Sequence, residues 1–183
     1  MNFKELGKFS KQLQVKEYKR IYHANQLPEK DLPEIVILGK SNVGKSTLIN
    51  TMLNHKISRV SKSPGCTRWL GYIRLPEVVI MDVPGYGYAK VAKGFQEFWS
   101  KMMTNYINAK RTDEVWLLID SRRGFQEIDE DTVKAFSFCN VIRIFTKADQ
   151  KGSFKQEGEI NCSTKNGIGI EELRELLTQT TYR

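Results

Sequence analysis

Residues 39–46 read Gly-Lys-Ser-Asn-Val-Gly-Lys-Ser and follow directly on the apolar run at 35–38. This is the phosphate-binding loop pattern GxxxxGKS, in which glycines let the backbone curl until its N–H groups point at phosphate oxygens. The helix that follows offers its positive N-terminus to the same anion. The pattern predicts a nucleoside triphosphate site in which Lys45 neutralises the β and γ phosphates and Ser46 ligates Mg²⁺. The loop residues expected to contact nucleotide are Gly39, Lys40, Ser41, Asn42, Val43, Gly44, Lys45 and Ser46.

Strand-like and helix-like patterns alternate along the rest of the chain. Strands are predicted at 34–38, 69–75, 78–82, 115–120, 141–146 and 159–162, and helices at 44–53, 95–107, 129–138 and 170–177. The second and third strands read as a hairpin. We therefore expect a three-layer α/β fold: a mostly parallel sheet of about six strands, helices on both faces, and one antiparallel hairpin strand. Residues 3–21 could form a helix, whereas 17–24 also reads as a strand, and the pattern leaves both open.

The chain of 183 residues fits one domain, 25–183, preceded by a basic extension at 1–24. Its apolar stretches are no longer than strands, and no leader peptide is seen, so a cytoplasmic protein is expected. The net charge is +8, and residues 35–96 alone carry +7, with nine Lys and Arg against Glu77 and Asp82. Positive charge therefore accompanies the phosphate-binding loop. The three cysteines, Cys66, Cys139 and Cys162, have no metal-ligand spacing.

Two further segments can complete the phosphate side of the site. Asp82-Val83-Pro84-Gly85 ends a predicted strand, where Asp82 can reach the Mg²⁺ shell through water and the Gly85 amide can meet the γ-phosphate. Thr67 follows Pro64-Gly65-Cys66, and its hydroxyl can close onto the metal when the γ-phosphate is present. Predicted contacts here are Gly65, Cys66, Thr67, Asp82, Val83, Pro84 and Gly85, with Ser46, Thr67 and Asp82 around the metal.

Residues 146–149, Thr-Lys-Ala-Asp, select the base. The Asp149 carboxylate can accept hydrogen bonds from N1–H and the 2-amino group of guanine, whereas adenine offers neither donor. Lys147 can lay its stem along the base, and residues 163–165 can present a backbone amide to the guanine O6. The predicted base contacts are Thr146, Lys147, Ala148, Asp149, Cys162, Ser163 and Thr164.

These motifs stand in the order found in translation-factor-like GTPases. The phrase Asp-Val-Pro-Gly-Tyr-Gly-Tyr-Ala at 82–89, and threonine rather than asparagine at 146, resemble the EngB (YsxC/YihA) family over about residues 20–178. The resemblance implies a Mg²⁺-dependent cytosolic GTPase that acts in maturation of the large ribosomal subunit, with a cell-division or septation phenotype. The chain departs from the family at 147–158, where twelve residues leave room for a turn rather than a helix.

Tyr86 stands where many GTPases carry a water-orienting glutamine, so we expect intrinsic hydrolysis no faster than roughly 10⁻⁴ to 10⁻³ s⁻¹. Asn42 resembles the asparagine with which some of these GTPases hold K⁺, which makes K⁺ stimulation a hypothesis to test. The catalytic candidates are Asn42, Lys45, Thr67 and Gly85.

The basic segment 54–74 can be either a solvated loop or an RNA contact, whereas Trp69 and Tyr72 are expected to pack within their strand. Arg122 and Arg123 are read first as a surface turn and second as a partner contact. The leading hypothesis is a monomeric switch that docks on the large ribosomal subunit. The alternatives are a G-domain that regulates a membrane-associated assembly or transport, and an ATP-using kinase, which Asp149 disfavours.

Overall fold

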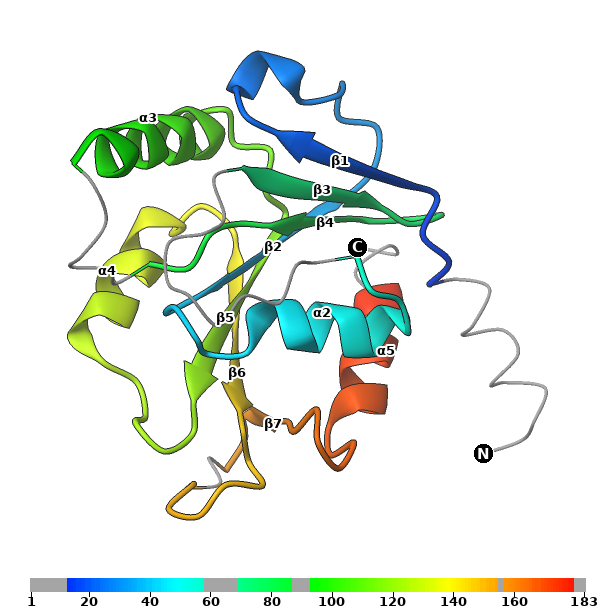
Figure 1. The fold of residues 1–183 in the computed structure, drawn as a ribbon, viewed down its shortest axis with the longest axis vertical. Helices are drawn as coiled ribbons and strands as arrows, with labels where there is room; N and C mark the ends of the chain where they lie inside the picture. The colour runs from blue at the N-terminus through cyan, green and yellow to red at the C-terminus, as the bar shows by residue number, and fades with distance from the viewer. Residues whose placement is uncertain (1–12, 58–68, 87–92, 155–156, 180–183) are drawn as a thin grey trace.

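The computed structural model describes residues 13–57, 69–86, 93–154 and 157–179. A twisted sheet lies between two layers of helices, with α2 and α5 on one face and α3 and α4 on the other (Figure 1). The elements are β1 Glu17–Ile21, η1 Ala24–Gln26, β2 Glu34–Gly39, α2 Lys45–Leu53, β3 Leu70–Arg74, β4 Val79–Asp82, α3 Lys93–Asn108, β5 Glu114–Asp120, α4 Glu127–Ala135, β6 Asn140–Thr146, β7 Ile160–Asn161 and α5 Ile170–Gln179.

The sheet has the strand order β1-β3-β4-β2-β5-β6-β7 within the described residues. Strands β4, β2, β5, β6 and β7 are parallel, and β3 forms the expected antiparallel hairpin with β4. Strand β1 decides between helix and strand for residues 17–21, because it pairs antiparallel with β3 from Glu17 opposite Arg74 to Ile21 opposite Leu70. Residues 3–12, where a helix was also possible, lie outside the described part. The three-layer α/β prediction is confirmed, and the chain segment before β2 joins the sheet.

Two apolar clusters form the core, one on each face of the sheet. Leu48, Ile49 and Met52 of α2 pack with Leu173 and Leu177 of α5 on one face. On the other face α3 contributes Met102 and Tyr106, and Phe136 follows directly after α4. Alternate residues of β2 enter opposite clusters, which explains why residues 35–38 are continuously apolar. Among the aromatic residues of α3, Tyr106 is buried, whereas the side chains of Phe95, Phe98 and Trp99 lie outside the described part.

The limits of α4 and the connection between β6 and β7 can be compared with the sequence prediction. Helix α4 runs from Glu127 to Ala135, whereas the sequence predicted 129–138. It begins at Glu127 because the Asp129 carboxylate accepts a hydrogen bond from the Gln126 backbone N–H at 2.9 Å and caps its N-terminus. Between β6 and β7, residues 147–154 form turns rather than a helix, as their number predicts. No helix formed by the described residues has the length and apolar character needed to cross a bilayer.

Candidate functional site

The phosphate-binding loop joins β2 to α2 at the carboxyl edge of the sheet. Gly44 precedes α2 with a φ of 108°, a conformation that side chains rarely adopt. At Gly39 a Cβ atom would lie 2.8 Å from Val43 Cγ1 and 3.0 Å from the Leu118 carbonyl oxygen, so only glycine fits where the loop leaves the sheet. These positions give the loop the tight curl that its sequence predicts, with the N-terminus of α2 at its end.

Lys45, Ser46 and Asp82 come together on the phosphate side. Lys45 Nζ forms an ion pair with the carboxylate of Asp82, which ends β4 beside β2, and both side chains are about nine-tenths buried. Ser46 follows Lys45 in the first turn of α2. The residues predicted to meet phosphate and metal are therefore neighbours. Gly65, Cys66 and Thr67, which were predicted to close this side, lie outside the described residues.

The segment that follows Asp82 packs directly on the phosphate-binding loop. The Ser41 N–H donates to the Tyr86 carbonyl at 3.0 Å, and the Tyr86 N–H donates to the Gly39 carbonyl at 3.2 Å. A Cβ atom on Gly85 would lie 3.0 Å from both the N and Cα atoms of Ser41. Glycine at position 85 is therefore required for this close approach, and backbone amides of both segments are brought to one place.

The Tyr86 phenol points to helix α4, where its hydroxyl donates to the Asp129 carboxylate. Burial, followed by the neighbouring carboxylate, raises the pKa of this phenol far above its ordinary value, so it stays a donor. The sequence drew attention to Tyr86 only because it stands where many GTPases carry a water-orienting glutamine. The structure shows a tie between the Asp82–Tyr86 segment and α4 that the motifs did not indicate.

Thr146 and Lys147 attach the base side to the phosphate-binding loop. The Thr146 hydroxyl lies 2.8 Å from the Val43 carbonyl and 3.2 Å from the Ile119 carbonyl. Lys147 Nζ donates to the Asn42 carbonyl at 2.7 Å and to the Asp120 carboxylate at 2.9 Å. A threonine hydroxyl thus makes links across the edge of the sheet, and the base-side motif and the loop form one unit.

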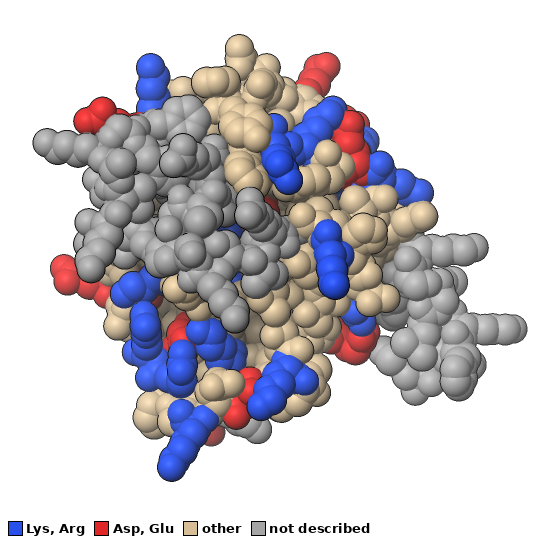
Figure 2. Space-filling view, in the orientation of Figure 1, with Lys and Arg blue, Asp and Glu red and all other residues tan. Residues whose placement is uncertain are grey.

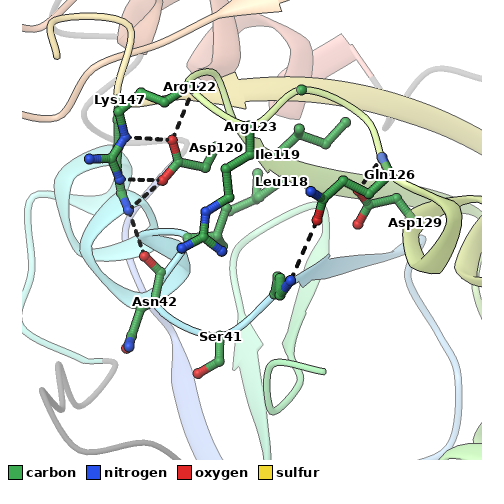
Figure 3. A pocket seen from close by; sticks show the side chains of 13 residues that line it. Ser41, Asn42, Leu118, Ile119, Asp120, Arg122, Arg123, Gln126, Asp129 and Lys147 are labelled. Carbon is green, nitrogen blue, oxygen red and sulfur yellow. Dashed lines mark hydrogen bonds and ion pairs between the residues drawn. The ribbon is translucent and has the colours of Figure 1, made fainter. Parts of the chain in front are cut away.

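Asp120 holds Lys147 through a network that the sequence did not predict. The Arg122 guanidinium donates to both oxygens of Asp120, at 2.9 and 2.6 Å. These bonds, and those from Lys147, hold the pKa of the Asp120 carboxyl well below its ordinary value. Figure 3 shows this network beside a cavity of about 150 Å³, lined by the phosphate-binding loop, the end of β5 and the start of α4. An acid that ends a buried strand just before two arginines is the signal that could have found it.

Asp149 and Ser163 lie beside each other from different segments. The Ser163 hydroxyl donates to the Asp149 carboxylate at 2.6 Å, and this bond lowers the pKa of that carboxyl. Ala148 N–H donates to the Cys162 carbonyl at 3.1 Å, which brings the predicted Cys162, Ser163 and Thr164 next to the base-side motif. Cys162 contributes backbone only, because its side chain lies in the core, where burial raises the thiol pKa to about 12.

Known proteins share both this sequence and this fold. A family described as "50S ribosome-binding GTPase" matches residues 34–147. A "Probable GTP-binding protein EngB" of Aquifex aeolicus is 41% identical over 167 residues, covering 81% of this chain and 91% of that protein. The chain belongs to the EngB family of GTP-binding proteins. It is accordingly a GTPase with the G-domain fold, and the resemblance drawn from its motifs is confirmed.

Solved structures agree with this assignment. The crystal structure of a probable EngB protein matches with a TM-score of 0.64 and 27% identity, covering 81% of this chain and 98% of that one. Era in complex with MgGDPNP and nucleotides 1506–1542 of 16S ribosomal RNA matches with a TM-score of 0.66 and 24% identity, covering 81% and 56% of the two chains. The second likeness shows the fold alone. The residues clustered at the carboxyl edge are the candidate nucleotide site of this GTP-binding protein family member.

Proposed function

We propose that this EngB-family GTPase is a nucleotide-dependent switch in assembly of the large ribosomal subunit, required for normal cell division. The observation that carries the guanine site is the attachment of Thr146 and Lys147 to the phosphate-binding loop, with Asp149 held by Ser163 next to it. This arrangement supports simultaneous recognition of base and phosphate. The ribosomal role is supported by the description of the matching family and by the +7 charge of residues 35–96.

Magnesium fits the phosphate side. The Ser46 hydroxyl and the Asp82 carboxylate are the hard oxygen donors adjacent to Lys45, and Thr67 is the proposed third. When bound, the ion neutralises phosphate charge as the γ-phosphate departs.

The protein residues supply charge and position. Lys45 lies where its ammonium can meet the β and γ phosphates in place of Asp82, and the Gly85 amide is proposed to sense the γ-phosphate. Tyr86 directs its phenol to Asp129, so it supplies no group that orients water, which supports slow hydrolysis. Asn42 is proposed to help hold K⁺. Hydrolysis measured in KCl and NaCl, for the wild type and Asn42→Ala, tests this: equal rates in both salts would remove K⁺ from the mechanism.

Co-sedimentation with purified ribosomal subunits tests the switch. The chain is mixed with large or small subunits in the presence of a non-hydrolysable GTP analogue, GDP or no nucleotide. We expect recovery with the large subunit in the GTP-analogue state and less in GDP. Equal recovery in both nucleotides would contradict the switch, and no recovery in any state would contradict the ribosomal role.

Nucleotide choice has its own test. Because Asp149 pairs with donors that adenine lacks, GDP is expected to bind at least a hundredfold more tightly than ADP, following the loss when a hydrogen-bonding site meets the wrong partner. Calorimetric titration of the same preparation with both nucleotides measures the ratio. Comparable affinities would contradict the guanine site and favour the kinase alternative.

A further inference from the structure

A cation and two aromatic rings gather where β1 and β3 lie side by side. The Arg20 guanidinium carbon lies 4.6 Å from the centroid of the Trp69 ring. The Tyr22 ring lies 6.0 Å from the same ring, tilted by 52°. In the sheet register Ile21 pairs with Leu70, so Tyr22 follows and Trp69 precedes the last pair. The three side chains therefore form one cluster built from segments almost fifty positions apart in the chain.

The cluster is open to solvent. Ile21 is 2% exposed and points into the core, whereas its neighbours Arg20 and Tyr22 point to the opposite face, where Tyr22 is 40% exposed. Tyr72, three positions after Trp69, is 1% exposed and packs as its strand pattern predicts. Trp69 packs against Arg20 and Tyr22 but is partly exposed, so part of its ring stays accessible.

The charge of Arg20 is not neutralised by an acid within the described part of the chain. Five other arginines there pair with carboxylates: Arg74 with Asp31, Arg111 with Glu34, Arg122 with Asp120, Arg143 with Glu159 and Arg174 with Glu171. Arg20 instead covers an aromatic ring and has the Tyr18 and Tyr22 phenols, rather than a carboxylate, as neighbours, so its positive charge stays available to an anion. Lys and Arg side chains are visible over β1 in Figure 2. Two exposed aromatic rings beside an arginine without a carboxylate partner suit a ligand that carries both negative charges and planar rings.

We propose that Arg20, Tyr22 and Trp69 form a stacking platform for a single-stranded segment of RNA. The proposal rests on the ribosomal role proposed above and names the part of the chain that meets the RNA. Unpaired bases stack on tyrosine and tryptophan rings, and a guanidinium can contact the phosphate or stack in turn. In base-paired RNA the faces of the bases are covered by neighbouring bases, so the proposed partner is single-stranded.

The platform is also joined to the nucleotide site. Trp69 immediately precedes β3, which pairs with β4 so that Gly71 lies opposite Asp82, the residue paired with Lys45. In sequence Trp69 lies two positions after Thr67, the predicted γ-phosphate sensor. A change of nucleotide would therefore act on the chain on both sides of Trp69, one of the three platform residues. RNA affinity is expected to be higher with the GTP analogue than with GDP.

Fluorescence anisotropy of a labelled twelve-nucleotide uridine-rich RNA, titrated with the full chain and the GTP analogue, tests the platform. Trp69→Ala is expected to weaken binding about tenfold, the change that corresponds to ~1.4 kcal/mol and lies in the range for loss of one stacked base. Trp69→Phe keeps a ring and should stay within about threefold of wild type. Tyr22→Ala and Arg20→Gln are expected to weaken binding by several-fold each.

Two matched controls lie elsewhere on the surface. Phe154→Ala removes an aromatic ring that is 65% exposed, and Lys134→Gln removes a cation whose side chain is 70% exposed on α4. Both should bind RNA as the wild type does. GDP affinity of every variant confirms that it is folded, because the platform contributes no predicted nucleotide contact.

Each contrary result has a defined meaning. Unchanged RNA affinity in Trp69→Ala and Tyr22→Ala overturns the platform, and so does weakening in Arg20→Gln alone, which would indicate a purely electrostatic contact. Trp69→Ala that keeps its RNA affinity but no longer co-sediments with large subunits would indicate a protein partner and also overturns it. If all three variants co-sediment as the wild type does, the platform fails and the ribosomal role stands. If the wild type binds the RNA but sediments with no subunit, the ribosomal role fails and the stacking result is judged alone.

Discussion

On the base side of the site, Thr146 and Lys147 bind main-chain atoms of the phosphate-binding loop; on the phosphate side, Lys45 and Asp82 bind each other. Thr146 and Lys147 donate to the Val43 and Asn42 carbonyls, groups that the nucleotide does not need. Lys45 and Asp82, by contrast, pair with each other, although the proposed function uses Lys45 for phosphate and Asp82 for the metal. We therefore expect the base side to keep its bonds when nucleotide binds, whereas the Lys45–Asp82 pair separates.

The largest effect is expected from Asp149→Asn on the base side. Replacing the carboxylate removes two charge-assisted hydrogen bonds, worth ~1.5–3 kcal/mol each, so GDP affinity should fall roughly 10²- to 10⁴-fold. Xanthosine diphosphate should gain, because its 2-oxo group can accept from the asparagine amide. Titration with both nucleotides measures the exchange, and Gln150→Ala, which removes the 3.0 Å neighbour of Asp149, serves as control. Retained GDP affinity in Asp149→Asn would mean that the base is read elsewhere.

A smaller loss is expected from Asp120→Asn, which takes the carboxylate from Lys147 and Arg122 together. A hydrogen bond to a charged group contributes ~1.5–3 kcal/mol, so GDP affinity should fall by about tenfold to a hundredfold. Arg122→Gln leaves the 2.9 Å bond between Lys147 and Asp120 and should have a weaker effect. Stopped-flow GDP release measures both variants. If Asp120→Asn releases GDP at the wild-type rate, the base side does not depend on this network.

Tyr86→Phe is expected to change stability and not chemistry. It removes the donor to Asp129, at a cost of about 1 kcal/mol in the free energy of unfolding measured in urea. GTP hydrolysis should stay within twofold, because the phenol points to α4. Tyr106→Phe makes the same chemical change at the buried Glu34, far from the nucleotide, and is the matched control. A hydrolysis rate that changes tenfold in Tyr86→Phe alone would place the phenol in the reaction.

The smallest effect is expected from pH between 5 and 8. The pKa values of Asp120 and Asp149 are lowered in the folded protein, so both carboxylates stay ionised across this window and GDP affinity should be flat. Their contribution to stability is fully present above the unfolded value of about 3.9 and is lost as pH falls toward the lower folded values. Thermal unfolding from pH 3 to 8 should therefore show a decline only at the acid end. Asp120→Asn should flatten that decline, and an unchanged acid limb would contradict the assignment.

Much of the fold follows from local pattern. The runs at 35–38 and 115–120 became strands buried on both faces, because the centre of a parallel sheet under two helical layers offers no other environment, whereas β6 is buried only from Ile144 to Thr146. Residues 17–24 could not be decided in the same way. Their strand exists through pairing with β3, a partner some fifty positions away, which no local pattern contains.

The candidate site divides along the same line. Motif spacing predicted Lys45, Asp82, Lys147 and Asp149, because each belongs to a motif that stands at the carboxyl end of a strand. The ties from Lys147 to Asp120 and from Tyr86 to Asp129 depend on strand register and on the position of α4, so the sequence could not show them. The predicted sensor Thr67 lies outside the described residues and stays a prediction.

Strand β7 has two residues, Ile160 and Asn161, and among the described residues its strand partners are Ile144 and Phe145 of β6. Residues 147–154, which follow β6, form turns and no helix. A guanine base held between Asp149 and the segment after β7 would therefore stabilise the last strand. The stability that nucleotide adds, RT ln(1 + [L]/Kd), would then be concentrated there, and amide hydrogens of β7 would exchange with solvent at a rate governed by nucleotide occupancy.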